Sequence, residues 1–381
     1  MNNLIHKKTP VIIQFGTSRF LQAHVDYFVA SSIAQGTSNT KIVVVQSSSS
    51  ATGKAKVAAI NKKAVYPVHI QGMYQGEVVD RIEQIDAFCG AIQASADWDQ
   101  LVELFCYNAT HMVSNTADQG YMLFDDDSLA DTPQKSFPAK LLSLLFARYL
   151  TTAKPITLMP CELIANNGST LKAIILKLAQ QWQMDAAFIQ WLDSKCMWVN
   201  SLVDRIVSKA LEPLGAVAEP YALWAIEQQV GLELPCVHRD VRVVSSLKSI
   251  EWLKLSLLNL SHSYLVDLWM RGDFSEIKTV FQAMQNNELR SALQTLLDTE
   301  IVPVLEAMSL GEDVQGYLAS VFERFENPFL EHQLSDIAQN HAQKIERRLL
   351  PIFEQGHELL PKLAMTKLKA CLVRNEIQLE G

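Results

Sequence analysis

The sequence predicts an α/β protein, in which a doubly wound, Rossmann-like parallel sheet is followed by an all-helical C-terminal domain. Over the first 245 residues, short β-branched runs alternate with segments of helical periodicity. Beyond about residue 244 the strand signals stop and helical periodicity alone remains. A length of 381 residues suits two domains, which we place at 1–245 and 246–381.

The N-terminal elements follow one another as β-α-β units. Residues 11–15 (VIIQF) and 41–46 (KIVVVQ) are continuous apolar runs, typical of strands buried in a parallel sheet. Residues 20–35, between these two strands, carry apolar side chains at helical spacing. Further along we expect a hairpin at 65–71 and 77–81, a helix at 98–107, and strands at 111–114 and 156–159. Strands and helices in this order favour right-handed crossovers and hence a parallel sheet.

The C-terminal third is expected to be helical throughout. Apolar residues recur at helical spacing over four segments, 250–270, 274–284, 288–308 and 333–349. A helical domain after a dinucleotide-binding sheet suggests an active site in the cleft between the two, outside the carboxyl ends of the strands.

Composition excludes several classes of protein. Hydrophobic residues make up 49%, so the chain is not disordered, and a net charge of -8 argues against a nucleic-acid partner. No apolar run approaches the roughly 20 residues that span a bilayer, and the N-terminus lacks a signal-peptide pattern. Six well-separated cysteines are typical of a reducing compartment. We therefore expect a cytoplasmic protein without a membrane or nucleic-acid partner; its oligomeric state is not predicted.

A candidate nucleotide-binding turn joins the first strand to the first helix. Gly16 permits the tight turn, and the start of the helix offers N–H groups to a pyrophosphate. The G-x-G-x-x-G fingerprint is incomplete, because Ser18 occupies the second glycine position and Gln22 lies near the third. An ordinary βα turn is the alternative. The candidate cofactor contacts at this turn are Phe15, Gly16, Thr17, Ser18, Arg19 and Phe20.

The second strand ends without the acidic residue that binds the adenosine ribose in NAD sites. Gln46 and Ser47 stand there instead. Their side chains can hydrogen-bond to a ribose, but they would not repel a 2′-phosphate. NAD is the expected cofactor, and NADP is an alternative.

Lys254, Asn259 and His262 share one segment, WLKLSLLNLSH. At about 100° per residue in an α-helix, the three lie within an arc of about 140°. Leucines occupy most other positions, so we expect a buried helix. Burial favours the neutral form of a lysine, which suits a general base or acid. The alternative is a lysine that reaches solvent and two hydrogen-bonded core residues.

The spacing Lys254-x4-Asn259-x2-His262 resembles the signature of the long-chain, metal-independent polyol dehydrogenases, the mannitol dehydrogenase family. Six other segments resemble that family in the same order: FGTSRFLQAHVD, SNTADQG, SFPAKL, CELIANNG, NSLVDRIV and RFENPFL. The segment EPYALWAIE resembles the tagaturonate reductases (altronate oxidoreductases) within it. Ser18 departs from the family pattern, and the chain is shorter than expected for a tagaturonate reductase.

The resemblance implies roles for individual residues. The residue aligned with Lys254 is the general base, the asparagines aligned with Asn259 and Asn167 hold the developing alkoxide, and His262 orients a substrate hydroxyl. A helix-start turn, with Ser169 as N-cap, is the alternative for Asn167. Asn115 and Thr116 fall in the family's nucleotide loop. A mechanism with a lysine base needs no metal, and the scattered His and Cys residues form no zinc motif.

Four residues are candidates for the substrate side. Asp204 is placed by the resemblance near the lysine, with a buried ion pair to Arg205 as the alternative. Arg324, His332 and Lys344 are basic residues that would suit a carboxylate, with solvated surface positions as the alternative.

The sequence thus predicts an NAD(P)-dependent oxidoreductase that interconverts a secondary alcohol and a ketone on an open-chain sugar acid. Altronate and tagaturonate are the first choice of substrate pair. An uncharged polyol and ketose, such as mannitol and fructose, are the second. A relative that binds a nucleotide or sugar acid without turnover is a third interpretation.

Overall fold

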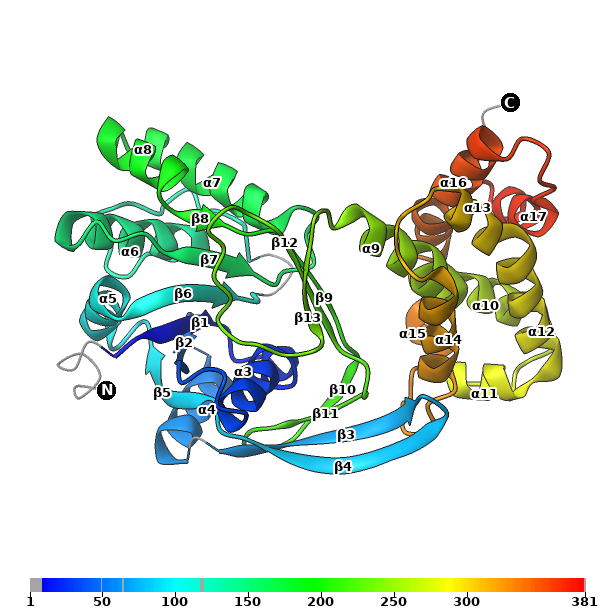
Figure 1. The fold of residues 1–381 in the computed structure, drawn as a ribbon, viewed down its shortest axis with the longest axis horizontal. Helices are drawn as coiled ribbons and strands as arrows, with labels where there is room; N and C mark the ends of the chain where they lie inside the picture. The colour runs from blue at the N-terminus through cyan, green and yellow to red at the C-terminus, as the bar shows by residue number, and fades with distance from the viewer. Residues whose placement is uncertain (1–8, 49, 64, 117–119, 380–381) are drawn as a thin grey trace. The chain divides into compact units, whose positions relative to one another are not determined.

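The computed structural model describes residues 9–48, 50–63, 65–116 and 120–379 (Figure 1). Two compact units make up the chain. Unit 1 comprises Met1–Ile70, Arg81–Ala218 and Ala222–Leu247. Unit 2 comprises Gln71–Asp80, Glu219–Tyr221 and Lys248–Gly381. The division after Leu247 lies close to the one expected from periodicity, whereas the assignment of two short earlier segments to unit 2 has no signal in the sequence.

Unit 1 is built on a six-stranded sheet with the strand order β5-β2-β1-β6-β7-β8. Every pairing in it is parallel. Numbered by their appearance in the chain, the six strands lie in the order 3-2-1-4-5-6 of a dinucleotide-binding sheet. The predicted fold class is therefore confirmed. The strands are β1 (Val11–Phe15), β2 (Lys41–Gln46), β5 (Phe88–Gln93), β6 (Ala109–Ser114), β7 (Thr157–Pro160) and β8 (Met197–Trp198).

Helices cover both faces of this sheet, α5 to α8 on one face and α3 and α4 on the other (Figure 1). The apolar runs of β1 and β2 are fully buried between these layers, as parallel strands require. The helices are α2 (Arg19–Gln22), α3 (Val25–Ala34), α4 (Ala51–Lys62), α5 (Trp98–Tyr107), α6 (Phe137–Thr151), α7 (Asn167–Gln181) and α8 (Ala186–Ser194).

The helix expected at 20–35 is broken into α2 and α3, so that prediction was wrong in its continuity. The break falls at Ala23 and His24, where the His24 backbone (φ -128°, ψ -90°) leaves the helical region. The buried His24 ring lies 2.9 Å from the Leu223 carbonyl oxygen and stacks on Phe20. These contacts are long-range, and periodicity does not detect them.

Two smaller sheets complete the β structure. The expected hairpin is present but longer, as β3 (Tyr66–Tyr74) and β4 (Glu77–Ile85). It belongs to a sheet of order β10-β11-β3-β4, and a third sheet has the order β13-β12-β9. The sequence did not predict the short strands β9 (Ser201–Asp204), β10 (Val207–Ala210), β11 (Ala216–Ala218), β12 (Leu223–Glu227) and β13 (Val241–Val244).

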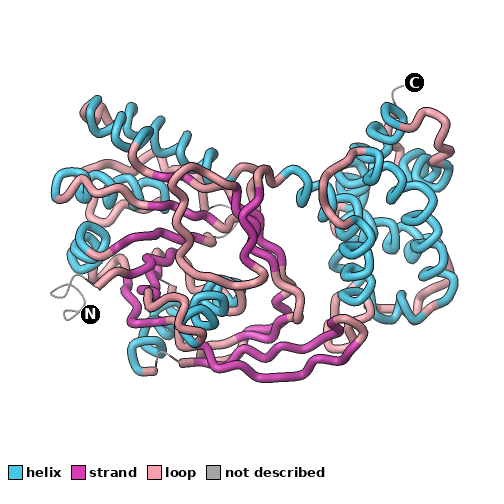
Figure 2. Tube along the Cα trace, viewed as in Figure 1, coloured by secondary structure: helices cyan, strands magenta, loops and turns pink. Residues whose placement is uncertain are grey.

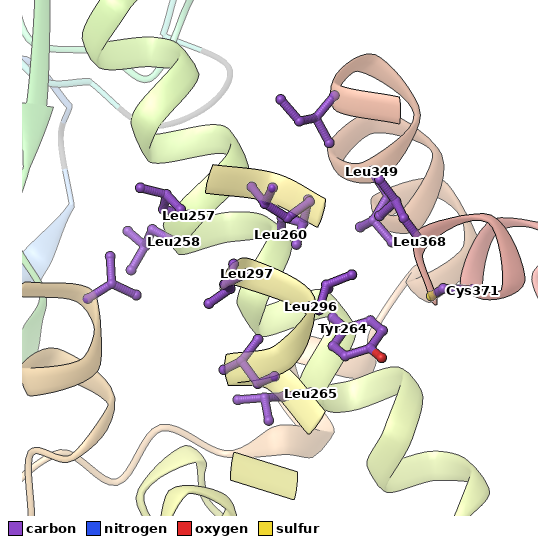
Figure 3. Packing of buried hydrophobic residues seen from close by; sticks show 14 of the residues in the cluster. Leu257, Leu258, Leu260, Tyr264, Leu265, Leu296, Leu297, Leu349, Leu368 and Cys371 are labelled. Carbon is purple, nitrogen blue, oxygen red and sulfur yellow. The ribbon is translucent and has the colours of Figure 1, made fainter. Parts of the chain in front are cut away.

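From Lys248 onward the described chain is helical (Figure 2). Leucine-rich faces pack into one core, part of which Figure 3 shows around Leu257, Leu260 and Leu297. Two of the expected helices contain a π-helical stretch that periodicity did not indicate. The elements are α9 (Lys248–Leu253), η1 (Lys254–Asn259), α10 (Leu260–Arg271), α11 (Val280–Gln285), α12 (Asn287–Leu296), η2 (Leu297–Ile301), α13 (Val302–Ala307), α14 (Val314–Phe325), α15 (Leu334–Ala338), α16 (His341–Leu359) and α17 (Thr366–Arg374).

Candidate active site

The turn after β1 lies where the strand order of the sheet reverses, between β1 and β6. Gly16 has φ +126°, and a Cβ atom there would lie 2.8 Å from the Asn115 carbonyl oxygen. The Gly16 N–H donates to Val45 O, and the Asn115 N–H donates to Phe15 O. Only glycine fits this turn, which leaves the backbone open to close approach by a ligand. The residues present therefore fit a dinucleotide pyrophosphate.

The other candidate cofactor contacts of this turn differ in exposure and in their hydrogen bonds. The Ser18 hydroxyl caps α2 by accepting from the Leu21 N–H at 3.2 Å. Arg19 is exposed, whereas Phe15 is fully buried against Phe137. Phe20 is half-buried. Because α2 has only four residues, its dipole is smaller than the sequence suggested, and the backbone of the turn becomes the main anion-binding feature.

The end of β2 is linked to this turn by hydrogen bonds. The Thr17 hydroxyl donates to Gln46 Oε1 at 2.9 Å, and the Lys56 Nζ of α4 donates to Thr17 O at 2.9 Å. Gln46 is buried, and Ser47 beside it is half-buried. Lys56 was not among the candidates from sequence, although it lies in a lysine-containing segment without acids.

A buried carboxylate, Glu162, organises the loop after β6. Its oxygens accept from the Thr116 N–H and hydroxyl, both at 3.0 Å, and from the hydroxyls of Ser114 and Tyr121. The Asn115 side chain donates to Cys161 O at 2.7 Å. Asn115 and Thr116 are candidates from the sequence, whereas Glu162 is not. The only signal for Glu162 was its place after a predicted strand.

Asn167 begins α7 and is almost completely buried. Its Nδ2 lies within hydrogen-bond distance of the carbonyl oxygens of Pro160, Glu162 and Ser201, and its Oδ1 accepts from the N–H groups of Gly168 and Ser201. This carboxamide is engaged by the backbone, so an alkoxide would have to displace one of these partners. The helix does start here, but its N-cap is Asn166 and not the expected Ser169.

A second carboxyl, Asp26 on α3, is fully buried behind the turn. Burial raises the pKa of Asp26 to about 8, although hydrogen bonds from Tyr66 and Gln14 oppose the shift. The Tyr66 oxygen lies 3.0 Å from Asp26 Oδ2 and 3.1 Å from Gln22 O. A protonated Asp26 can donate to this oxygen while Tyr66 donates to Gln22. Burial therefore favours the protonated, uncharged form of Asp26 in the folded protein.

In unit 2, Lys254 and Asn259 are the first and last residues of the π-helix η1. The Leu260 N–H donates to Leu255 O, five residues back. Residues five apart are about 140° apart in an α-helix but lie nearly above one another where bonds join i and i+5. The π-helix thus brings Lys254 and Asn259 closer than the α-helix assumed from sequence would. Both side chains are half-buried, as is Leu255, so this segment is less buried than expected.

Neighbouring elements of unit 2 fix this segment in place. Arg348 of α16 donates to Asn259 O at 3.2 Å and to the Ser263 hydroxyl at 2.9 Å. His262 begins the next turn, is buried, and packs its ring on Phe325 and His332, with centroids 4.3 and 4.8 Å away. The sequence did not indicate Arg348, because its partners lie more than 80 positions away.

Arg324 is buried and already has a carboxylate partner within unit 2. Its Nε and Nη2 donate to the two oxygens of Glu219 at 3.0 and 2.8 Å, and its guanidinium stacks on Tyr221. The charge of Arg324 is therefore matched within the protein, which the sequence did not predict.

His332 and Lys344 belong to the same electrostatic environment as Arg324. Burial lowers the pKa of His332; Asp336 opposes this shift, and Arg324 and Lys344 add to it. Burial and the adjacent Arg348 lower the pKa of Lys344, whose Nζ donates to Ile337 O. The surroundings of His332 therefore favour its neutral form.

Asp204 and Arg205 lie in unit 1, at and after the end of β9, and both are buried. The Arg205 guanidinium stacks on the Tyr27 ring at 4.7 Å and donates to Ala23 O. These contacts give Arg205 a structural role in anchoring the segment between α2 and α3.

A pocket of about 520 Å³ lies at the amino ends of β6, β7 and β8, lined in part by His111, Lys154 and Glu233. Dinucleotides bind at the opposite edge of such sheets, so this pocket is not the expected cofactor site. In the described part of the chain, no group of three or more His, Cys, Asp or Glu residues is arranged to hold a metal ion. None of the helices described is both long and apolar enough to cross a membrane.

Comparison with known proteins agrees with this architecture. Residues 10–235 match the mannitol dehydrogenase Rossmann domain, and residues 246–372 match the mannitol dehydrogenase C-terminal domain. The chain belongs to the mannitol dehydrogenase family. Because both matched domains describe a dehydrogenase, this membership makes the chain an oxidoreductase.

Proteins similar to this chain include an altronate oxidoreductase by sequence and two polyol dehydrogenases by fold. An altronate oxidoreductase of Bacillus subtilis is 32% identical over 91% of this chain and 75% of its own length. A D-sorbitol dehydrogenase solved in substrate-free form has a TM-score of 0.83 at 21% identity, over 97% of this chain and 81% of its own. A Pseudomonas fluorescens mannitol 2-dehydrogenase, solved with NAD and D-mannitol, has a TM-score of 0.72 at 16% identity. The match covers 97% of this chain and 78% of the mannitol 2-dehydrogenase chain.

Proposed function

We propose that this chain is a nicotinamide-dependent dehydrogenase that interconverts an aldonate and a ketouronate, such as altronate and tagaturonate. The observation that carries the proposal is the π-helix η1, which gathers a lysine and an asparagine one turn before His262. π-Helical turns are frequent at functional sites, and this one has an amine at its first residue and an amide at its last, with the His262 imidazole in the following turn.

We assign the proton transfer to Lys254. During oxidation its neutral Nζ accepts the proton of the substrate hydroxyl, and during reduction its ammonium returns that proton. The Asn259 carboxamide donates a hydrogen bond to the oxygen as negative charge develops on it. His262, held against Phe325 and His332, orients a second hydroxyl.

The cofactor residues proposed in unit 1 are the Gly16 turn, Gln46 and Ser47 after β2, and Asn115 and Thr116 after β6. When bound, a nicotinamide dinucleotide supplies the acceptor or donor of the hydride. The backbone at Gly16 admits the pyrophosphate, and Glu162 holds the loop of Asn115 and Thr116 in one conformation. We assign Asn167 a positioning role, because its carboxamide joins the start of α7 to β9.

The preference for a sugar acid rests on charge and on the named relative from Bacillus subtilis. Lys344 and Arg348 lie on one face of α16, four residues apart, and Arg348 bonds to the Asn259 carbonyl. Since Glu219 matches the charge of Arg324, we assign carboxylate recognition to Lys344 with His332. The same Arg324–Glu219 pair also favours the second candidate function, a dehydrogenase of uncharged polyols. Because Glu219 neutralises Arg324, one fewer cation is available to bind a substrate carboxylate.

The test is a steady-state assay that follows nicotinamide absorbance with aldonates, polyols and the corresponding keto compounds. Turnover with an aldonate or ketouronate at least tenfold more efficient than with any polyol is the expected result. Turnover with polyols alone would replace the proposal by the second candidate. Absence of turnover with any of them, while the dinucleotide still binds, would favour a binding protein without catalysis.

A further inference from the structure

We propose that Asp26, in its protonated form, is a positioning residue for the dinucleotide. It acts through Tyr66 and two buried glutamines, Gln14 and Gln22, which hold the turn after β1. The inference deepens the proposed function and rests on it, because it concerns how the same turn is prepared for a pyrophosphate. Its consequence is that the affinity for a dinucleotide depends on a single buried proton.

The two peptide groups that follow Gly16 have their carbonyl oxygens turned towards buried glutamines. Gln14 Nε2 lies 3.5 Å from Gly16 O. Gln22 Nε2 donates to Thr17 O at 3.3 Å. Because the carbonyl and the N–H of a trans peptide point in opposite directions, the N–H groups of Thr17 and Ser18 point away from the glutamines. Within the described ranges these two N–H groups have no hydrogen-bond partner, so they are available to the oxygens of a pyrophosphate.

Gln22 is the better fixed of the two glutamines. Its Oε1 accepts from the Gly215 N–H at 2.8 Å, while its Nε2 donates to the turn. Its backbone carbonyl, at the end of α2, lies 3.1 Å from the Tyr66 hydroxyl oxygen. Since both ends of the Gln22 amide are bonded, the Thr17 carbonyl is held wherever the end of α2 is held. The direction of the Ser18 N–H therefore depends on the contact between Gln22 and Tyr66.

The Tyr66 hydroxyl lies between two acceptors but has one proton to donate. Its oxygen is 3.1 Å from Gln22 O and 3.0 Å from Asp26 Oδ2. If Asp26 is protonated, it donates to Tyr66 and Tyr66 donates to Gln22, so both contacts are hydrogen bonds. If Asp26 is ionised, the Tyr66 proton turns to the carboxylate, because a charge-assisted hydrogen bond is the stronger one, and Gln22 O loses its donor. The protonated state is thus the one that holds α2 and the turn.

The side chains that act on the Asp26 carboxyl are uncharged. They are the titratable Tyr66 hydroxyl of β3 and the Gln14 amide of β1, and burial raises the pKa of Asp26 to about 8 against their effect. Burial and the adjacent Asp26 raise the pKa of Tyr66 well above its ordinary value. Tyr66 therefore keeps its proton where Asp26 loses its own, and we expect the affinity for a dinucleotide to change near pH 8.

The test is a fluorescence titration of the full chain with NADH at several pH values from about 6 to about 9. The Kd should rise about tenfold between pH 7 and pH 9, because the protonated, binding-competent fraction falls to about one tenth at one pH unit above the pKa. Asp26→Asn, whose amide still donates to Tyr66, should keep the low Kd at about pH 9. Tyr66→Phe, which removes the donor to Gln22, should raise the Kd about fivefold at about pH 6 and abolish most of its further rise.

The matched control is Asp99→Asn, which removes an exposed carboxylate of the same unit and should reproduce the wild-type dependence on pH. A wild-type Kd that stays constant over this pH range would overturn the inference and leave the proposed function standing. The same rise in Asp26→Asn as in the wild type would also overturn it. If NADH bound at no pH, the proposed function and the inference would both fall.

Discussion

The two asparagines expected to hold the alkoxide have contrasting surroundings. Asn167, at the start of α7 in unit 1, is 1% exposed and hydrogen-bonds through both ends of its carboxamide to backbone groups of three other segments. Asn259, at the end of the π-helix in unit 2, is half-buried, and the contact from Arg348 is to its backbone carbonyl. The same residue type at two motif positions thus suits two roles.

The difference shows that a polar side chain can act on a substrate only if its hydrogen-bond donors and acceptors are not already used by the protein. A carboxamide has two N–H donors and one carbonyl acceptor. Those of Asn167 are used to join β7, α7 and β9, which keeps the loops at the carboxyl edge of the sheet in register. We therefore assign charge stabilisation to Asn259 and positioning to Asn167.

The largest expected effect is that of Lys254→Met. Without the amine, turnover should fall about a thousandfold or more, since acid–base catalysis contributes up to about 10⁴. Nicotinamide absorbance measures kcat, and fluorescence titration measures dinucleotide affinity, which should change little because the cofactor residues lie in unit 1.

Lys369→Met is the matched control for this variant, because Lys369 is exposed on α17 of the same unit. It should keep full activity. Substantial residual turnover in Lys254→Met at neutral pH would remove Lys254 from the role of base.

The second test compares Asn259→Ala with Asn167→Ala. Removing Asn259 should lower kcat about 100-fold, as loss of an oxyanion donor does, and change the free energy of unfolding by less than about 1 kcal/mol. Removing Asn167 should destabilise unit 1 by about 3 kcal/mol, because buried backbone groups lose their partners. Steady-state kinetics and thermal denaturation on both variants distinguish the two roles. The reverse pattern would exchange our assignments.

A smaller effect is expected from Lys344→Ala. Loss of one charge-assisted contact should raise the KM for an aldonate about tenfold while leaving kcat nearly constant. Lys362→Ala, which removes an exposed lysine of the same unit, is the control. An equal rise in KM for an uncharged polyol would show that Lys344 does not recognise the carboxylate.

The last prediction concerns stability rather than turnover, and the pH at which Asp26 loses its proton. Its pKa is about 8 in the folded protein against an ordinary 3.8, so the unfolded chain releases this proton at lower pH than the folded one. The neutral carboxyl therefore costs no stability below about pH 4, and stability falls as the pH rises from there to about 8. Asp26→Asn, which can still donate to Tyr66, should raise Tm at pH 8 by roughly 10 °C, because about four pKa units correspond to about 5 kcal/mol, and should have little effect at pH 4. A Tm difference independent of pH would contradict the assignment.

Much of the fold was predictable from local pattern. The β-branched runs at 11–15 and 41–46 gave buried strands, and the end of strand signals near residue 244 coincides with the last strand, β13. The break at His24 was not predictable, because it depends on a carbonyl 199 residues away. The π-helix η1 was not predicted, because the spacing of its apolar residues is equally compatible with an α-helix.

The candidate site was predictable where its residues are close in sequence. Lys254, Asn259 and His262 lie within nine positions, so the sequence could indicate them as one candidate set. Glu162 and Glu219 were missed, because their partners Thr116 and Arg324 lie 46 and 105 residues away. A pattern of neighbouring residues cannot indicate hydrogen bonds between side chains so far apart in the sequence.

The sequence by itself determined the alternation of strands and helices in the parallel sheet and the glycine turn, because periodicity and steric preference act over a few residues. Only the tertiary structure decided which polar groups are already bonded: Asn167 to the backbone, Arg324 to Glu219, and Glu162 to the loop after β6. Burial makes this satisfaction of donors and acceptors obligatory, and the partners that provide it come from segments far apart in the chain.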